Sequence, residues 1–311
     1  MIEIKRYQET DKNIWDNFIS IAKNGNFLFY RDYMDYHKHR FVDHSLIIYK
    51  KERVVGVLPA SENESGIVSH GGLTFGGLIM HLDLKAAEVL DVFQKIIEYY
   101  TVFKYDNIVY KVIPSVFHHY PAEEDIYALF RYNAKLIRRD ISSIISLDNT
   151  IRFSETKRQS VTKCQKNDIQ IVESIDFAEY WDLLSNVLEK FDTKPVHSLS
   201  EIKYLKSLFP QNIRLFEARM DGELMAGIVI YEYGHVIHTQ YMANSKKGRN
   251  MGALDYINHE LINNVYKDKR YYSFGISTEN MGRVLNTGLI QQKEMMGARG
   301  IVYDFYRIDL K

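Results

Sequence analysis

The chain has 311 residues, and its 40 Lys and Arg balance its 40 Asp and Glu, so the formal net charge is zero. This length suits two domains of about 150 residues each, and the balanced charge gives no overall electrostatic case for a nucleic-acid partner. The one cysteine, Cys164, cannot form an internal disulfide, and no stretch approaches about 18 uninterrupted apolar residues. The composition therefore predicts a cytoplasmic protein without a membrane segment and without a nucleic-acid partner.

The first half alternates helical and extended patterns. Apolar residues recur at helical spacing from Ile14 to Ala22, and the pair Asn24-Gly25 is typical of a helix end. Two short apolar runs around a polar turn then predict a hairpin, and a glycine-rich stretch, SHGGLTFGG, follows at 69–77. Besides the first helix, the expected elements are strands at Ser45–Tyr49 and Val54–Pro59, a helix at 85–103, a strand at Asn107–Ile113, a helix at about 122–132 and a strand at about 136–147.

The second half repeats this order. Its hairpin is the clearest element, because Asp221-Gly222 tolerates the positive φ angles of a tight turn between two apolar runs. The expected elements are a helix carrying Phe177, Trp181, Leu184 and Leu188, hairpin strands Ile213–Met220 and Glu223–Glu232, a strand His235–Ala243, a basic loop Lys246–Gly252, a helix Ala253–Tyr266, a strand Tyr271–Ile276, a helix Thr287–Met296 and a strand Arg299–Ile308.

The shared order of elements indicates an internal duplication, in which Trp15 precedes the first hairpin much as Trp181 precedes the second. Between the halves lies a polar, basic stretch, Asp148–Asn167, which we interpret as a solvated linker helix. The sequence thus predicts an α/β (α+β) protein with two similar domains, residues 1–148 and 149–311, each a mixed, mostly antiparallel sheet flanked by helices.

A basic, glycine-containing loop joins the strand ending at Ala243 to the helix beginning at Ala253. Helix N-termini collect unpaired N–H groups and the positive end of the dipole, so they bind phosphates. Glycines let the backbone approach a pyrophosphate without interference from Cβ. Such a loop is also common as a plain turn, so the pattern alone leaves both interpretations open. As a cofactor site it would comprise Tyr241, Lys246, Lys247, Gly248, Arg249, Asn250 and Gly252.

This half resembles the GNAT superfamily of acyltransferases, whose pyrophosphate loop lies between the fourth strand and the third helix. GNAT enzymes often carry Asn, Tyr and Gly around the helix after the fifth strand. Here Asn286 and Gly297 stand at that spacing, with Lys293 in place of the tyrosine. The Lys-x-x-x-Gly pattern and the basic helix at 158–169 are similar to the Fem-type transferases, which are tandem GNAT folds, although the sequence has no counterpart of the inserted long helices of some members. The stretches 69–77, 114–125 and 274–278 look closer to tandem GNAT N-acyltransferases that act on nucleotide-linked amino sugars.

The resemblance implies an N-acyltransferase that moves an acyl group from acyl-CoA to a dTDP-type amino sugar in polysaccharide or O-antigen biosynthesis. The first half would be degenerate, because no basic glycine loop follows Gly76, so CoA would bind the second half alone. The sugar nucleotide would lie between the halves. A backbone N–H near Met242 would bind the thioester oxygen, and a sugar amine would need no strong general base. The implied catalytic residues are Met242, Glu279, Asn286, Lys293 and His238, and the implied substrate contacts are His70, Gln240 and Glu279.

Other interpretations stay open at this point. A Fem-like transferase that takes an aminoacyl group from tRNA would use the basic linker helix, and a non-catalytic binding protein would need the fold alone. His70 also fits a tight turn, His238 a structural strand position, and Lys293 a solvated helix position. The pair His118-His119 has no third metal ligand at a usual spacing, so no metal is expected. The sequence is compatible with a monomer or an oligomer.

Overall fold

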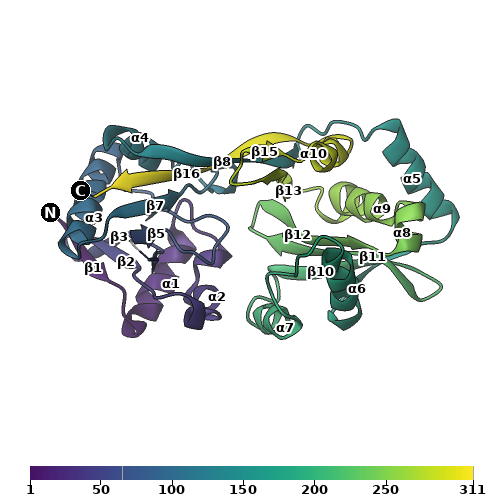
Figure 1. Ribbon diagram of the computed structural model, residues 1–311, viewed down its shortest axis with the longest axis horizontal. Helices are drawn as coiled ribbons and strands as arrows, with labels where there is room; N and C mark the ends of the chain where they lie inside the picture. Colours follow the sequence, from purple (N-terminus) through teal and green to yellow (C-terminus); the bar gives the residue numbers. More distant parts are fainter. Residues whose placement is uncertain (65, 311) are drawn as a thin grey trace. The chain divides into compact units, whose positions relative to one another are not determined.

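Residues 1–64 and 66–310 are described by a computed structural model in which the chain divides into two units (Figure 1). The first unit comprises residues 1–140, 280–284 and the chain from 302 onward, and the second comprises 141–279 and 285–301. Each unit has a sheet flanked by helices, which confirms the expected α/β fold class.

The first unit starts with a strand and two helices before its hairpin. Its elements are β1 (Ile2–Arg6), α1 (Lys12–Ile21), α2 (Arg31–Asp35), β2 (Leu46–Lys50), β3 (Arg53–Leu58), β4 (Ser61–Glu62), β5 (Gly66–Val68), β6 (Ile79–Met80), α3 (Ala86–Val102), β7 (Asn107–Lys111) and α4 (Glu124–Arg131), with 3-10 turns at Glu9–Asp11, Phe27–Phe29, Lys38–Arg40 and Ser115–Phe117. Strands β1, β2, β3 and β6 form an antiparallel sheet, while β5 pairs in parallel with β7. The apolar face of α3 is buried in the core of this unit through Val89, Val92, Phe93 and Ile96.

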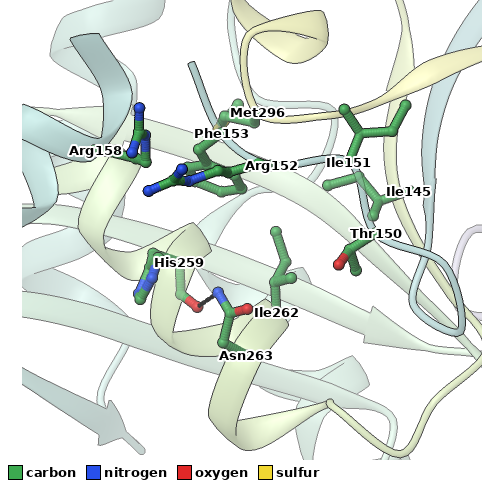
Figure 2. A pocket seen from close by; sticks show the side chains of 10 residues that line it. All are labelled: Ile145, Thr150, Ile151, Arg152, Phe153, Arg158, His259, Ile262, Asn263 and Met296. Atoms are coloured by element: carbon green, nitrogen blue, oxygen red, sulfur yellow. Dashed lines mark hydrogen bonds between the residues drawn. The ribbon is translucent and has the colours of Figure 1, made fainter. Parts of the chain in front are cut away.

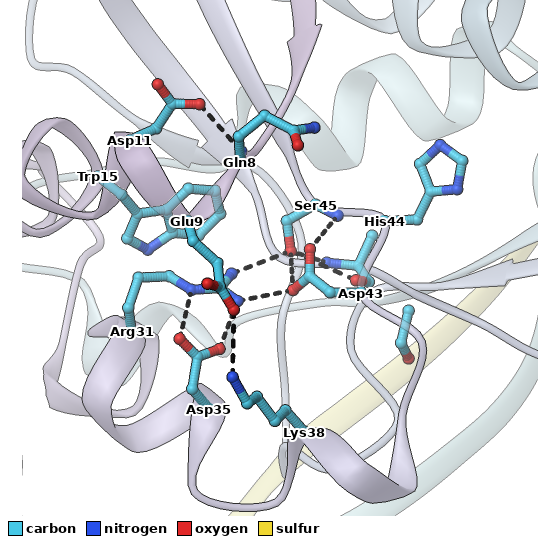
Figure 3. A network of polar contacts seen from close by, with 12 residues as sticks. Gln8, Glu9, Asp11, Trp15, Arg31, Asp35, Lys38, Asp43, His44 and Ser45 are labelled. Atoms are coloured by element: carbon cyan, nitrogen blue, oxygen red, sulfur yellow. Dashed lines mark hydrogen bonds and ion pairs between the residues drawn. The ribbon is translucent and has the colours of Figure 1, made fainter.

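A buried arginine ties helix α2 to the start of the hairpin (Figure 3). Arg31 Nη2 lies 2.5 Å from Asp35 and 2.9 Å from Asp43, and its guanidinium carbon lies 3.9 Å from the centre of the Tyr7 ring. Asp43 in turn accepts hydrogen bonds of 3.0 Å from the N–H and the hydroxyl of Ser45. Two carboxylates and an aromatic face thus compensate for the burial of the guanidinium, so we assign this network a structural role.

The second unit contains one continuous set of strands. Its elements are α5 (Glu155–Lys166), β9 (Gln170–Ser174), α6 (Ala178–Glu189), α7 (Leu199–Leu208), β10 (Ile213–Met220), β11 (Glu223–Glu232), β12 (Val236–Asn244), α8 (Lys246–Met251), α9 (Ala253–Glu260), a π-helical turn (Leu261–Val265), β13 (Tyr271–Ile276), β14 (Thr278–Glu279) and α10 (Thr287–Glu294). The strand order is β8-β13-β12-β11-β10-β9, with β8 defined below, and β12 and β13 are its parallel pair. Helices α8 and α9 lie on one face of this sheet and α6 on the other (Figure 1).

Two long strands, β8 (Lys135–Ser146) and β16 (Arg299–Asp309), run from one unit into the other. The chain also passes from the first unit to the second within β15 (Val284–Leu285). Strand β8 ends the first half of the sequence but pairs with β13, whereas β16 ends the chain but pairs with β7. The last strand of each half therefore completes the sheet of the other unit. This exchange moves the boundaries away from the expected division into 1–148 and 149–311.

Most expected elements are present, and the hairpin strands β10 and β11 have the bounds that the sequence predicts. Two expectations were wrong. The basic loop Lys246–Gly252 is helix α8, because the Ser245 side chain accepts a hydrogen bond from the Gly248 N–H and caps a new helix. The helix Ala253–Tyr266 leaves α-helical geometry after Glu260. The linker helix is present as α5; most of its residues are exposed or half-buried, and one face is buried through Lys157, Val161 and Cys164.

In the described part of the chain, no helix combines the length and the apolar character needed to span a bilayer.

Candidate functional site

Strands β12 and β13 pair briefly and then separate. They run in parallel as far as His238 and Ser273, beyond which β12 stays paired with β11 to Asn244 while β13 follows β8 to Ile276. Residues 239–244 of β12 therefore have no strand partner on the side of β13 among the described residues. Unpaired backbone N–H groups at such a gap are available to a ligand.

Lys293 of α10 lies at the end of β13 and is almost wholly buried, with 2% of its surface exposed. Its Nζ donates hydrogen bonds to the carbonyl oxygens of Gly275 (2.9 Å) and Ile276 (2.8 Å) and to Ser277 Oγ (2.8 Å). Burial lowers the pKa of Lys293 to about 8. The alternative of a solvated helix residue was wrong: Lys293 is an internal cation that fixes the backbone where β13 ends.

His238 faces the same region from β12. Its Nδ1 lies 3.1 Å from Ser273 Oγ, and a Cβ added at Gly275 would lie 3.2 Å from its Cε1 atom. Burial, and secondarily the nearby Lys293 cation, lowers the pKa of His238 to about 4. The imidazole is therefore neutral near pH 7 and is poorly matched to act as a general base there. The structure thus brings His238 and Lys293 together in one buried polar cluster, beside the strand gap.

Glu279 and Asn286 also lie together, in the exposed segment that follows β13. Asn286 Nδ2 donates to Glu279 Oε1 (2.8 Å), while Asn286 Oδ1 accepts from the Leu289 N–H (2.9 Å). The second contact makes Asn286 the N-cap of α10, so its position in the sequence has a structural reason. The Glu279 carboxylate remains accessible to a polar substrate.

The three consecutive candidates on β12 have different surroundings. Gln240 sits at a bulge, since Ile230 of β11 pairs with Thr239 and the preceding residue, Val229, pairs with Tyr241. Met242 faces α9, where its Sδ lies 4.0 Å from Asn258 Nδ2. Tyr241 faces the opposite side of the sheet. Tyr241 therefore lies apart from the other cofactor candidates, which are on or near α8, and its contact with a cofactor stays a prediction.

Tyr241 is instead paired with His197, which the sequence did not single out. The Tyr241 hydroxyl lies 2.6 Å from His197 Nδ1 and accepts from the His197 N–H (3.3 Å), and the Trp181 ring packs edge-on at 5.3 Å. Burial raises the pKa of Tyr241 to about 12. His197 is 4% exposed and lies in an irregular segment before α7, where no periodic pattern or motif marks it.

The predicted pyrophosphate glycines serve the packing of the chain itself. A Cβ at Gly248 would lie 1.9 Å from the carbonyl oxygen of Met225, so helix α8 needs a glycine to pack on β11. Gly252 has φ +81°, and a Cβ there would lie 2.4 Å from the Cβ of Ser160 in α5. Lys247 forms a 2.6 Å ion pair with Glu223. These glycines and Lys247 therefore have structural roles that the loop interpretation did not foresee.

A cavity of about 400 Å³ nevertheless lies at the start of α9, between α5, α8 and α10, and Lys163, Arg249 and Asn250 are among its lining residues. Lys163 Nζ donates to the Asn250 carbonyl (2.9 Å), and Lys157 forms a 2.7 Å ion pair with Asp255. The first N–H groups of a helix lack partners within that helix. With Asp255 neutralised by Lys157, the cavity offers the combination of cations and helix N–H groups that suits a phosphate.

His70 lies in the first unit and is buried, with 3% of its surface exposed and φ +58°. Its carbonyl accepts a 2.9 Å hydrogen bond from Lys111 Nζ, and its ring packs against His37 and Phe41. Burial lowers the pKa of His70 well below its ordinary value. The interpretation as a tight turn fits this geometry better than an open substrate loop.

In the described part of the chain, no group of three His, Cys, Asp or Glu side chains has the arrangement needed to hold a metal ion. His118 and His119 contact backbone carbonyl oxygens instead, those of Ile113 (2.9 Å) and Gly25 (3.0 Å).

Comparisons with known proteins bear on the fold and on the family of one segment. Residues 172–281 match the family described as acetyltransferase (GNAT) domain. Similar solved structures include FemX, with 11% sequence identity and a TM-score of 0.70 over 99% of this chain and 97% of that one. L-PGS from Bacillus licheniformis has 12% identity and a TM-score of 0.63 over 99% of this chain and 93% of that one. A tandem GNAT protein from the clavulanic acid biosynthesis pathway has 11% identity and a TM-score of 0.55 over 100% of this chain and 99% of that one. None of the curated protein sequences matches the chain significantly. The second unit thus contains a GNAT acetyltransferase domain, and the protein is an acyltransferase.

Proposed function

We propose that this acyltransferase moves an acyl group from acyl-CoA to the amine of a nucleotide-linked amino sugar. The observation that carries the proposal is the gap between β12 and β13 beyond His238 and Ser273. Acyl transfer needs N–H donors where negative charge develops on the thioester oxygen, and preorganised backbone groups supply such donors at low cost. GNAT folds generally use acyl-CoA, and the cavity beside Arg249 and Lys163 supports a site for its pyrophosphate.

The residues at the gap support complementary roles. The N–H of Met242 or of a neighbouring β12 residue would donate to the thioester oxygen, and Lys293 would keep the end of β13 in place. Glu279, held by Asn286, would contact the incoming amine or a sugar hydroxyl. A sugar amine has a pKa below the ordinary lysine value of about 10.4, so a fraction is neutral and nucleophilic near pH 7 to 8. The choice of a dTDP-type sugar rests on the resemblance of stretches 69–77, 114–125 and 274–278 to known sugar acyltransferases.

The test is release of free CoA thiol from a panel of acyl-CoAs, with dTDP-linked amino sugars and simple amines as acceptors. Arg249→Ala and Lys163→Ala should each raise the KM for acyl-CoA by about tenfold, because each removes a charged phosphate contact. Lys203→Ala is the matched control, since Lys203 pairs with Asp176 and neither residue lines this cavity. Absence of thiol release with every acyl-CoA would rule out the donor, and acylation of simple amines alone would rule out the sugar.

A second candidate is a Fem-like transferase with an aminoacyl-tRNA donor. It is favoured by one observation: a cavity of about 500 Å³ along the outer face of α5 is lined by Arg158, Lys163 and Lys166. A tRNA donor would give steeply salt-dependent RNA binding and no CoA thiol release. Aminoacyl transfer from charged tRNA, measured with the same acceptors, separates the two candidates.

A further inference from the structure

A third cavity, of about 390 Å³, lies beside the later turns of α9 (Figure 2). It is bounded by the end of β8, by residues 150–158 leading into α5, and by the π-helical turn after α9. It shares no lining residue with the cavity at Arg249, and it shares only Arg158 with the cavity along the outer face of α5.

Two arginines supply the positive charge of the cavity. Arg152 and Arg158 line it, and none of its lining residues is an Asp or a Glu. Arg158 Nη2 contacts Glu155, but Arg158 Nε is buried without a hydrogen-bond partner in the described part of the chain. Arg152 is exposed at the rim, with no hydrogen bond or ion pair to any described residue. Two guanidinium groups with spare N–H donors and no lining carboxylate favour an anion with several oxygens.

The rest of the lining is apolar. Phe153, Ile262 and Met296 are buried, and the Phe153 ring packs edge-on against His259 with centroids 5.9 Å apart. Inorganic phosphate alone would leave this surface in contact with water. The lining therefore favours a ligand that joins a phosphate to a flat, weakly polar group.

We propose that this cavity binds a phosphorylated nucleoside, with the phosphate at Arg152 and Arg158 and the base against Phe153 and its apolar neighbours. Asn263 supports the orientation, because its Nδ2 donates to the His259 carbonyl (2.8 Å), which leaves Oδ1 as an acceptor for a base amino group (Figure 2). The volume lies within the range of small-ligand pockets, roughly 300 to 1,000 Å³.

Two sources share this chemistry: the 3′-phosphoadenosine end of CoA, and the nucleoside diphosphate of a nucleotide-linked acceptor. Only the choice between these sources rests on the proposed function. Binding of a nucleotide to the cavity is a separate claim, and it is measured without any acyl transfer.

The experiment is calorimetric titration of the intact protein with adenosine 3′,5′-bisphosphate, dTDP and inorganic phosphate. We expect one nucleotide to bind at least about tenfold more tightly than phosphate, and Arg152→Ala and Asn263→Asp each to weaken it about tenfold or more. Both positions are exposed, so the variants should fold normally. Lys203→Ala is the control and should leave nucleotide affinity unchanged, because Lys203 lines neither this cavity nor the one at Arg249.

Tighter binding of the adenosine bisphosphate that Arg152→Ala weakens would identify CoA as the source, and tighter binding of dTDP would identify the acceptor. Equal affinities for phosphate and both nucleotides, no binding at millimolar concentrations, or nucleotide binding that Arg152→Ala and Asn263→Asp leave unchanged would overturn the proposal. Nucleotide binding that needs Arg152, in a protein that releases no thiol from acyl-CoA, would uphold this site while refuting the proposed reaction.

Discussion

At the scale of single residues, Lys293 makes stability depend on pH. The pKa of Lys293 is lowered from the ordinary 10.5 to about 8 by burial, so between these values the unfolded chain binds more protons than the folded one. The free energy of unfolding should therefore rise with pH across this window, by on the order of 1 to 3 kcal/mol, and be insensitive to Lys293 below it. Urea unfolding of the wild type and Lys293→Met at several pH values measures the effect. If the unfolding free energies of the two proteins changed in parallel with pH, Lys293 would not be buried as described.

His238 provides a prediction about the reaction itself. Because the pKa of His238 is lowered to about 4, its protonation cannot produce a limb in the pH–rate profile near neutrality. His238→Ala should lower kcat/KM by about 10- to 10³-fold through lost positioning, with a profile parallel to the wild type from about pH 5.5 to about 9. Alanine at Glu279 or Asn286 should behave similarly. If one of these variants bound both substrates normally but lost all activity, and the acidic limb of the pH–rate profile disappeared with it, that residue would be a dedicated general base.

At the scale of elements, Gly252 joins α8 to α9 under two separate constraints. Its φ of +81° disfavours any side chain, and its missing Cβ makes room for Ser160 of α5. Gly222 is a matched control, because it has φ +82° and nothing within 4 Å of an added Cβ. Gly222→Ala should cost about 1 kcal/mol in unfolding free energy, and Gly252→Ala about 3 kcal/mol or more. Adding Ser160→Gly to Gly252→Ala should recover the difference in unfolding free energy between the two alanine variants. Equal losses of unfolding free energy in the two alanine variants would mean that α5 does not pack against Gly252.

The sequence predicts elements with local signals and misses those set by tertiary contacts. The hairpin around Asp221-Gly222 appears with its predicted bounds because turn chemistry and apolar alternation agree. Helix α8 was missed because its glycines suggested a loop, although the Ser245 cap was a usable signal. Motif spacing found Lys293, yet its burial depends on α10 packing against the end of β13. His197 had no local signal, since its partner Tyr241 lies 44 residues away.

At the scale of the whole molecule, the exchange of β8 and β16 means that neither half of the sequence contains all of its own unit. The first unit takes its final core residues, Ile308 and Leu310, from the C-terminal end of the chain. Ile308 pairs with Ile108 of β7 and is 3% exposed. A defect at position 308 should therefore weaken a unit whose other buried core residues, apart from Leu310, lie between Leu46 and Leu129.

Hydrogen exchange monitored by mass spectrometry tests this directly. Ile308→Asn should lower amide protection in α3 and β7 by at least about tenfold, because it places an uncompensated polar group in their core, while β11 keeps near-wild-type protection. Ile257→Asn is the matched control: Ile257 is fully buried in the core of the second unit, so this change should lower protection in β11 and spare α3. Loss of protection confined to β10 and β11 in Ile308→Asn would contradict the exchanged topology. Equal loss everywhere in both variants would mean that the two units unfold as one cooperative body despite their separate cores.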